Sequence, residues 1–154
     1  MISSLDKSAK YDVYKLVNHG YKETMGRIGK LPFPMSVEKA LSYIKNKLEV
    51  PVLRYAGNKD CLVKKIAILG GAGAEFAGVA KSIGADLYLT GDLKYHEAQD
   101  AAMNGLVIAD GGHFYTERVI IPYLAKRLRD EFKTRGWNVG VLEDVRAKDI
   151  FHCV

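Results

Sequence analysis

The chain has 154 residues, of which 48% are hydrophobic and 27% charged, a balance typical of one globular domain with its own core. No apolar run approaches the roughly 18 residues of a membrane span, and the first residues lack the apolar centre of a signal peptide. We therefore expect a cytoplasmic protein that does not contact membrane. The net charge of +5 arises within residues 1–60, where basic and acidic side chains are intermixed, so nucleic-acid binding is unsupported.

The first part of the chain predicts few regular elements. Residues 11–18 (YDVYKLVN) have a strand-like composition, and residues 19–35 are rich in Gly and Pro, which predicts a loop. Ser36 is a suitable N-cap for a helix over 36–49. Residues 50–57 then predict a further strand.

From Lys64 onward, strand-like and helix-like segments alternate. The strands are predicted at 64–69, 86–90, 106–110 and 137–143, and the helices at 74–84, 93–105 and 114–136. Pro122 lies inside the last helix, where it is expected to kink the helix or to begin its second segment. The order predicts one α/β domain over 1–154, a layered α/β/α arrangement with a mainly parallel sheet.

Candidate functional residues follow three of these strands, at the edge where ligands bind in such sheets. After the first strand, Gly71 and Gly73 match two glycines of the dinucleotide-binding pattern GxGxxG, but Phe76 replaces the third. Asp92 then stands where a ribose-binding acid is expected. A tight strand-to-helix turn and a general anion site remain alternatives.

The second candidate is GDLKYHEA. Asp92 and His96 are four residues apart and could share one face of a helix, and their position at the carboxyl end of a strand favours a functional role. A surface or capping histidine is the alternative.

The third candidate, DGGHFYTE, carries the strongest signal. His113 and Glu117 stand at i and i+4 of a predicted helix start, so their imidazole and carboxylate can point to one side. These groups suit Zn²⁺, Mn²⁺ or Fe²⁺. Two ligands are too few for a stable site, so others must come from another segment or chain. Acid/base work without metal and a structural turn remain alternatives.

The motifs TGDLKYHEA and IADGGHFYTE, with GRIGKL and ILGGAG upstream, resemble the GTP cyclohydrolase 1 type 2 homolog family, also called Ngg-interacting factor 3-like. The resemblance runs from about Gly26 to Leu142. It implies a metal-dependent α/β protein with a two-metal centre, commonly assembled as a hexameric ring. It also implies that His113 and Glu117 are metal ligands and that His96 lies by the same centre.

The resemblance covers only the C-terminal half of the family. It implies that the remaining ligands, a His-His pair and an aspartate, belong to the N-terminal half, and this chain has no adjacent histidines. Residues 1–30 look like the exit from an inserted domain, and residues 31–154 like the C-terminal portion of the family fold. The chain would then be a fragment, a split member or a truncated one. We expect incomplete occupancy by a divalent metal.

Three functions follow as hypotheses. The first is a portion of a metal-dependent hydrolase-like protein acting on a nucleotide or other phosphate-containing small molecule, with His96 and Asp92 as acid/base groups or as groups supporting the metal site. The second is a non-catalytic binding or assembly module with an incomplete metal site. The third is a Rossmann-like nucleotide binder that uses Gly71, Gly73 and Asp92.

Overall fold

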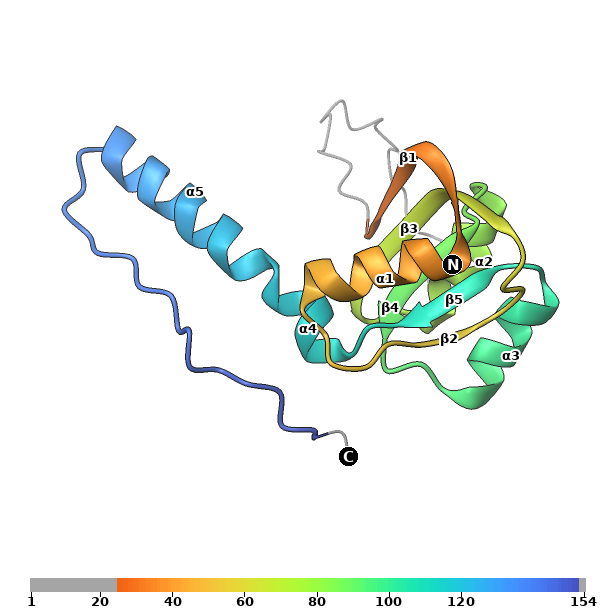
Figure 1. Cartoon of the computed structure of the whole chain (residues 1–154). Helices are drawn as coiled ribbons and strands as arrows, with labels where there is room; N and C mark the ends of the chain where they lie inside the picture. Colours follow the sequence, from red (N-terminus) through yellow and green to blue (C-terminus); the bar gives the residue numbers. More distant parts are fainter. Residues whose placement is uncertain (1–24, 153–154) are drawn as a thin grey trace, which may run out of the picture.

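The computed structural model describes residues 25–152, which form a five-stranded sheet in the order β1-β3-β4-β5-β2. The three central strands run parallel: β3 (Leu62–Ala72), β4 (Leu87–Gly91) and β5 (Val107–Asp110). The edge strands, β1 (Arg27–Ser36) and β2 (Arg54–Ala56), pair antiparallel with β3 and β5 (Figure 1). The predicted α/β class and the parallel centre of the sheet are confirmed.

Helices cover both faces of the sheet. The side chains of Leu87 and Leu89 on β4 pack with α1 (Val37–Leu48), and the side chain of Tyr88 between them belongs to the core beneath α2 (Ala77–Ser82) and α3 (Tyr95–Met103). Adjacent strand residues point to opposite faces, so one buried strand supplies both cores. The layered arrangement is therefore confirmed.

The start of α1 is the predicted one. The Ser36 hydroxyl accepts a hydrogen bond from the backbone N–H of Lys39 at 3.3 Å, which satisfies one of the unpaired amides of the first turn. The buried positions Val37, Ala40, Leu41 and Ile44 follow helical spacing and face the sheet.

The long C-terminal helix is divided in two. It forms α4 (His113–Arg118) and α5 (Ile120–Thr134), with Val119 between them. Pro122 is the third residue of α5, so the prediction that it begins a second segment is confirmed; in a first turn its missing N–H breaks no helical hydrogen bond. Figure 1 shows α5 extending away from the sheet and the chain beyond it running back in an extended form.

Two predicted elements are wrong in the structure, and a second predicted helix is divided. Part of the predicted loop 19–35 is β1, whose register shifts between Lys30 and Met35, the stretch that contains two prolines; an edge strand tolerates proline because one side makes no ladder bonds. Residues 137–143 form no strand, because no other described strand pairs with them. The helix predicted at 74–84 is a 3₁₀ turn, η2 (Ala74–Phe76), followed by α2.

The strand predicted at 11–18 lies outside the described residues. None of the helices in the described part of the chain is both long and apolar enough to cross a membrane.

Candidate metal site

His113 is the first residue of α4, directly after β5 and its two glycines. The start of this helix packs closely on the end of β4: a Cβ atom on Gly91 would lie 2.9 Å from the backbone nitrogen of His113. Only glycine at position 91 lets α4 approach β4 this closely. The glycine-rich sequence thus places the imidazole at the carboxyl edge of the sheet, as predicted.

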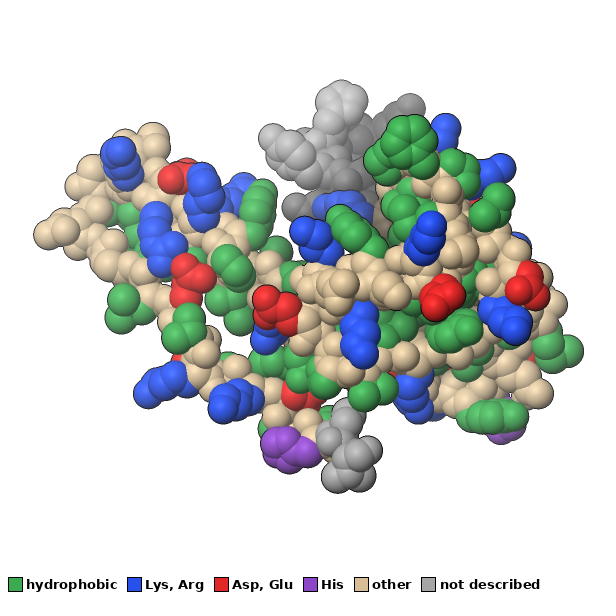
Figure 2. Space-filling model, in the orientation of Figure 1, with side chains coloured by type: hydrophobic (Ala, Val, Ile, Leu, Met, Phe, Trp, Pro, Cys, Tyr) green, Lys and Arg blue, Asp and Glu red, His purple; other side chains and the backbone are tan. Residues whose placement is uncertain are grey.

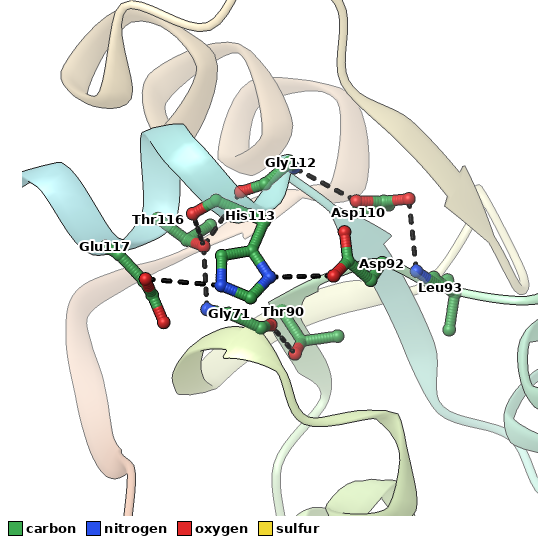
Figure 3. A network of polar contacts seen from close by, with 9 residues as sticks. All are labelled: Gly71, Thr90, Asp92, Leu93, Asp110, Gly112, His113, Thr116 and Glu117. Atoms are coloured by element: carbon green, nitrogen blue, oxygen red, sulfur yellow. Dashed lines mark hydrogen bonds and ion pairs between the residues drawn. The ribbon is translucent and has the colours of Figure 1, made fainter. Parts of the chain in front are cut away.

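The imidazole of His113 lies between two carboxylates (Figure 3). Its Nδ1 is 2.7 Å from Oδ2 of Asp92, and its Nε2 is 3.2 Å from Oε2 of Glu117. The hydrogen bond with Asp92 raises the pKa of His113 above its usual value; the charges of Glu117 and Asp92 add to the rise, and desolvation partly opposes it. The structure therefore joins His113 and Glu117, as the spacing predicts, and adds Asp92 to them.

Asp92 reaches the site from a turn and not from a helix. Its φ of +54° is left-handed, and α3 begins only at Tyr95, so the prediction that Asp92 and His96 share a helical face is wrong. His96 is the exposed second residue of α3 and makes an edge contact with the Tyr95 ring. Within residues 25–152, no hydrogen bond or ion pair joins His96 to Asp92, His113 or Glu117.

Gly71 forms the floor of the site. Its N–H donates to the Thr116 hydroxyl at 3.0 Å, and its carbonyl accepts from the Thr90 hydroxyl at 3.0 Å. It has a φ of +68°, and a Cβ there would meet the carboxylate of Glu117. The Gly71 amide is already hydrogen-bonded and lies beneath a carboxylate, so it is poorly placed to bind a phosphate. The geometry therefore favours a tight strand-to-helix turn over a dinucleotide-binding loop.

Three buried polar residues that hold this site together, Thr90, Asp110 and Thr116, are not predicted as site residues by any sequence motif. Thr90 and Asp110 were visible as polar residues near the ends of apolar strand segments, but that pattern alone does not say what they bond. Thr116 carried no signal, because a threonine inside a predicted helix is unremarkable.

A cavity of about 870 Å³ opens beside His113. Apolar side chains of three segments form much of its wall, and charged side chains lie among them. The apolar ones are Val50, Pro51, Val52, Phe114, Ile120, Ile121, Ile150 and Phe151, and the basic ones are Arg54, Arg118 and Lys148.

The donor atoms of His113 and Glu117 fit a divalent ion. Two ligand atoms that each lie about 2.1 Å from one ion at right angles are about 3 Å apart, close to the 3.2 Å between His113 Nε2 and Glu117 Oε2. Asp92 lies on the opposite side of the ring. Among the described residues, no group of three or more His, Cys, Asp or Glu side chains is arranged to hold a metal ion.

The profile of the Duf34/NIF3 (NGG1p interacting factor 3) family matches residues 3–148. A Bacillus subtilis protein named GTP cyclohydrolase 1 type 2 homolog is 36% identical over 85% of this chain and 35% of its own length. A Clostridium perfringens protein of the same name is 37% identical over 84% of this chain and 48% of its own length.

Among solved structures, that of a Bacillus cereus protein related to NIF3 superposes with a TM-score of 0.81 at 36% identity, over 85% of this chain and 36% of that one. A protein called ybgI, described as of unknown function, superposes with a TM-score of 0.62 at 26% identity, over 70% of this chain and 44% of that one. The chain therefore spans about a third to a half of the length of each of these four relatives. The resemblance predicted from the motifs is confirmed.

Proposed function

Because the chain belongs to the Duf34/NIF3 family, we propose that His113 and Glu117 supply part of a divalent, two-metal centre in a hydrolase-like protein. One observation carries the proposal: His113 Nε2 lies 3.2 Å from Glu117 Oε2 while its Nδ1 is held at 2.7 Å by Asp92. A carboxylate behind the ring is the usual support of a metal-binding histidine. Further ligands come from another segment or another chain.

In this arrangement, His113 and Glu117 each supply a different kind of metal ligand. A neutral His113 that donates from Nδ1 to Asp92 leaves the Nε2 lone pair free on the side of Glu117. Glu117 adds a negatively charged oxygen, which suits Zn²⁺, Mn²⁺ and Fe²⁺. Such an ion, when bound, supplies a water of lowered pKa for hydrolysis. That His96 takes part as an acid or base stays a prediction.

Metal content tests the proposal. The purified chain is loaded separately with Zn²⁺, Mn²⁺ or, anaerobically, Fe²⁺ and assayed by mass spectrometry of the metals. We expect bound metal in the wild type and a loss in His113→Ala and Glu117→Ala. Glu131→Ala, which removes an exposed glutamate on α5, is the matched control and should load like the wild type. Background metal in a folded wild type, or equal loading of all variants, would contradict the proposal.

The cavity beside His113 supports a small nucleotide or another phosphate-containing molecule as substrate. Arg54 and Lys148 place cationic groups on its wall, and Phe114 offers an aromatic surface for a base. Titration of ¹⁵N-labelled chain with GTP and with inorganic phosphate tests this. We expect GTP to shift the amide signals of Phe114 and its neighbours more than phosphate does; signals that stay unchanged with both ligands would exclude this class.

An assembly module is the second candidate function, and α5 favours it. Ile120, Tyr123 and Leu124 expose 55%, 62% and 49% of their surface. Figure 2 shows such hydrophobic side chains among the charged ones on this part of the molecule. A homo-oligomer, hexameric as the resemblance implies, would cover them. Sedimentation velocity of the wild type and Leu124→Glu tests this; a wild type that stays monomeric at high concentration would contradict it.

We also propose a cytoplasmic location. Cys61 is a free, half-buried thiol in the described part of the chain, and free thiols are typical of reducing compartments. Cell fractionation tests this location; recovery of the protein with the secreted or membrane fraction would contradict it.

A further inference from the structure

Asp110, the last residue of β5, is a buried carboxylate with three partners. Its side chain is 8% exposed. Oδ2 accepts from the Arg54 guanidinium at 2.5 Å. Figure 3 shows the two backbone partners: Oδ2 also accepts from the N–H of Leu93 at 3.3 Å, and Oδ1 accepts from the N–H of Gly112 at 3.0 Å. A buried charge requires partners of this kind, and removing one of them is costly.

The two amides belong to the segments that carry the proposed site. Leu93 follows Asp92 in the turn after β4, and Gly112 precedes His113 at the start of α4. The carboxylate of Asp110 therefore bonds both segments. Each of the two bonded amides belongs to a residue that is next in the chain to Asp92 or to His113. The 2.7 Å distance between Asp92 Oδ2 and His113 Nδ1 depends on how these segments are held together.

We propose that Asp110 is the positioning residue of this site and that Arg54 in turn holds Asp110. Asp110 keeps the carboxylate of Asp92 against Nδ1 of His113, which places the ring hydrogen on Nδ1 and directs Nε2 toward Glu117. The consequence for metal binding rests on the function proposed above, whereas the effect on the His113 ring does not.

The chain contains a matched control for Asp110. Oδ2 of Asp86, just before β4, accepts from the backbone N–H groups of Lys64 at 2.8 Å and Lys65 at 2.9 Å. Asp86 therefore accepts hydrogen bonds from two backbone amides, as Asp110 does, but it lies at the amino end of β4, away from the site. Asp86→Asn and Asp110→Asn both replace a carboxylate that accepts two backbone amides, and only the second lies at the site.

Two measurements on the full chain test the proposal. The first, without metal and at a pH where His113 is neutral, is the ¹⁵N spectrum of its ring, in which the Nδ1–H and Nε2–H forms differ. We expect Nδ1–H in the wild type and in Asp86→Asn, and a shift toward Nε2–H in Asp110→Asn. The second is affinity for Zn²⁺, expected to fall roughly 10-fold in Asp110→Asn only, the usual effect of losing an outer support.

The outcomes separate this inference from the proposed function. If the wild type binds no Zn²⁺ but the His113 ring carries its hydrogen on Nδ1 as expected, the proposed metal site is contradicted and the positioning role of Asp110 still holds. An unchanged ring form in folded Asp110→Asn, or the same change in Asp86→Asn, overturns the positioning role. If Asp110→Asn does not fold, Arg54→Leu decides: we expect a smaller shift in the same direction, and no shift overturns the proposal.

Discussion

The imidazole of His113 faces a carboxylate at each nitrogen, so its protonated form is stabilised in the folded protein. Since Asp92 makes the larger contribution to the raised pKa, Asp92→Asn should lower that pKa more than Glu117→Gln. The stabilisation is present in full below the unfolded pKa of about 6.5 and is lost as the pH rises through the raised pKa. An NMR titration of the metal-free chain measures the shift. A His113 pKa at the ordinary value, or a larger effect of Glu117→Gln, would contradict the geometry.

Gly71 is the residue whose replacement most directly disturbs Glu117. In Gly71→Ala the new methyl group would meet the Glu117 carboxylate and displace it, and the φ of +68° would cost about 1–2 kcal/mol of folding free energy. We expect a modest loss of stability in urea unfolding and a larger loss of metal affinity. Gly78→Ala is the matched control, because a Cβ there meets nothing within 4 Å. Equal metal affinity in both variants would show that Glu117 is not a ligand.

The sequence predicts contacts between residues that are close together in the chain. His113 and Glu117 are four positions apart at a helix start, so helical geometry alone brings them together. Asp92 is 21 positions from His113, and their contact depends on β4 lying beside β5 and on the left-handed turn at Asp92. Spacing along the chain carries no information of that kind, which is why the sequence pairs Asp92 with His96 instead.

Thr116 joins two elements, α4 and the end of β3. Its hydroxyl accepts from the Gly71 N–H and donates within its own helix to the carbonyl of Gly112. Thr116→Val keeps the shape but leaves the buried Gly71 N–H without its acceptor, which should cost about 1–3 kcal/mol. Urea unfolding measures this, with Thr116→Ser, which keeps the hydroxyl, as the control. If valine and serine destabilise equally, the hydroxyl is not what holds the two elements.

Sequence patterns predict the central elements because burial determines which of their positions are apolar. The strands β4 and β5 are buried along their whole length, and α1 shows one apolar stripe after a serine cap. Edge elements carry weaker patterns. β1 is mostly exposed and contains two prolines, so it resembled a loop, whereas residues 137–143 alternate like a strand but have no partner among the described strands. In both cases, the availability of a neighbouring strand to pair with, and not the intrinsic strand propensity of the residues, decides whether a strand forms.

The helices α1 and α5 have similar lengths, but α1 packs against the sheet and α5 is largely exposed. α1 has 12 residues and buries Val37, Ala40, Leu41 and Ile44 against the sheet. α5 has 15 residues, of which only Ala125 is buried, and its exposed ion pairs, Lys126–Asp130 and Arg135–Glu131, follow i to i+4 spacing. Such exposed pairs are screened by solvent and add little to stability, and a helix of this length without packing is marginal in water.

Hydrogen exchange should therefore distinguish the two helices. We expect the backbone amides of α5 to exchange roughly 10-fold or more faster than those of α1 in dilute chain, because local opening of α5 exposes almost no core. High salt should accelerate exchange in α5 further by screening its ion pairs. A gain of protection in α5 alone as the concentration rises would identify it as the surface where copies associate. Equal protection of α5 and α1 in a monomeric sample would show that α5 packs more closely than its exposed side chains indicate.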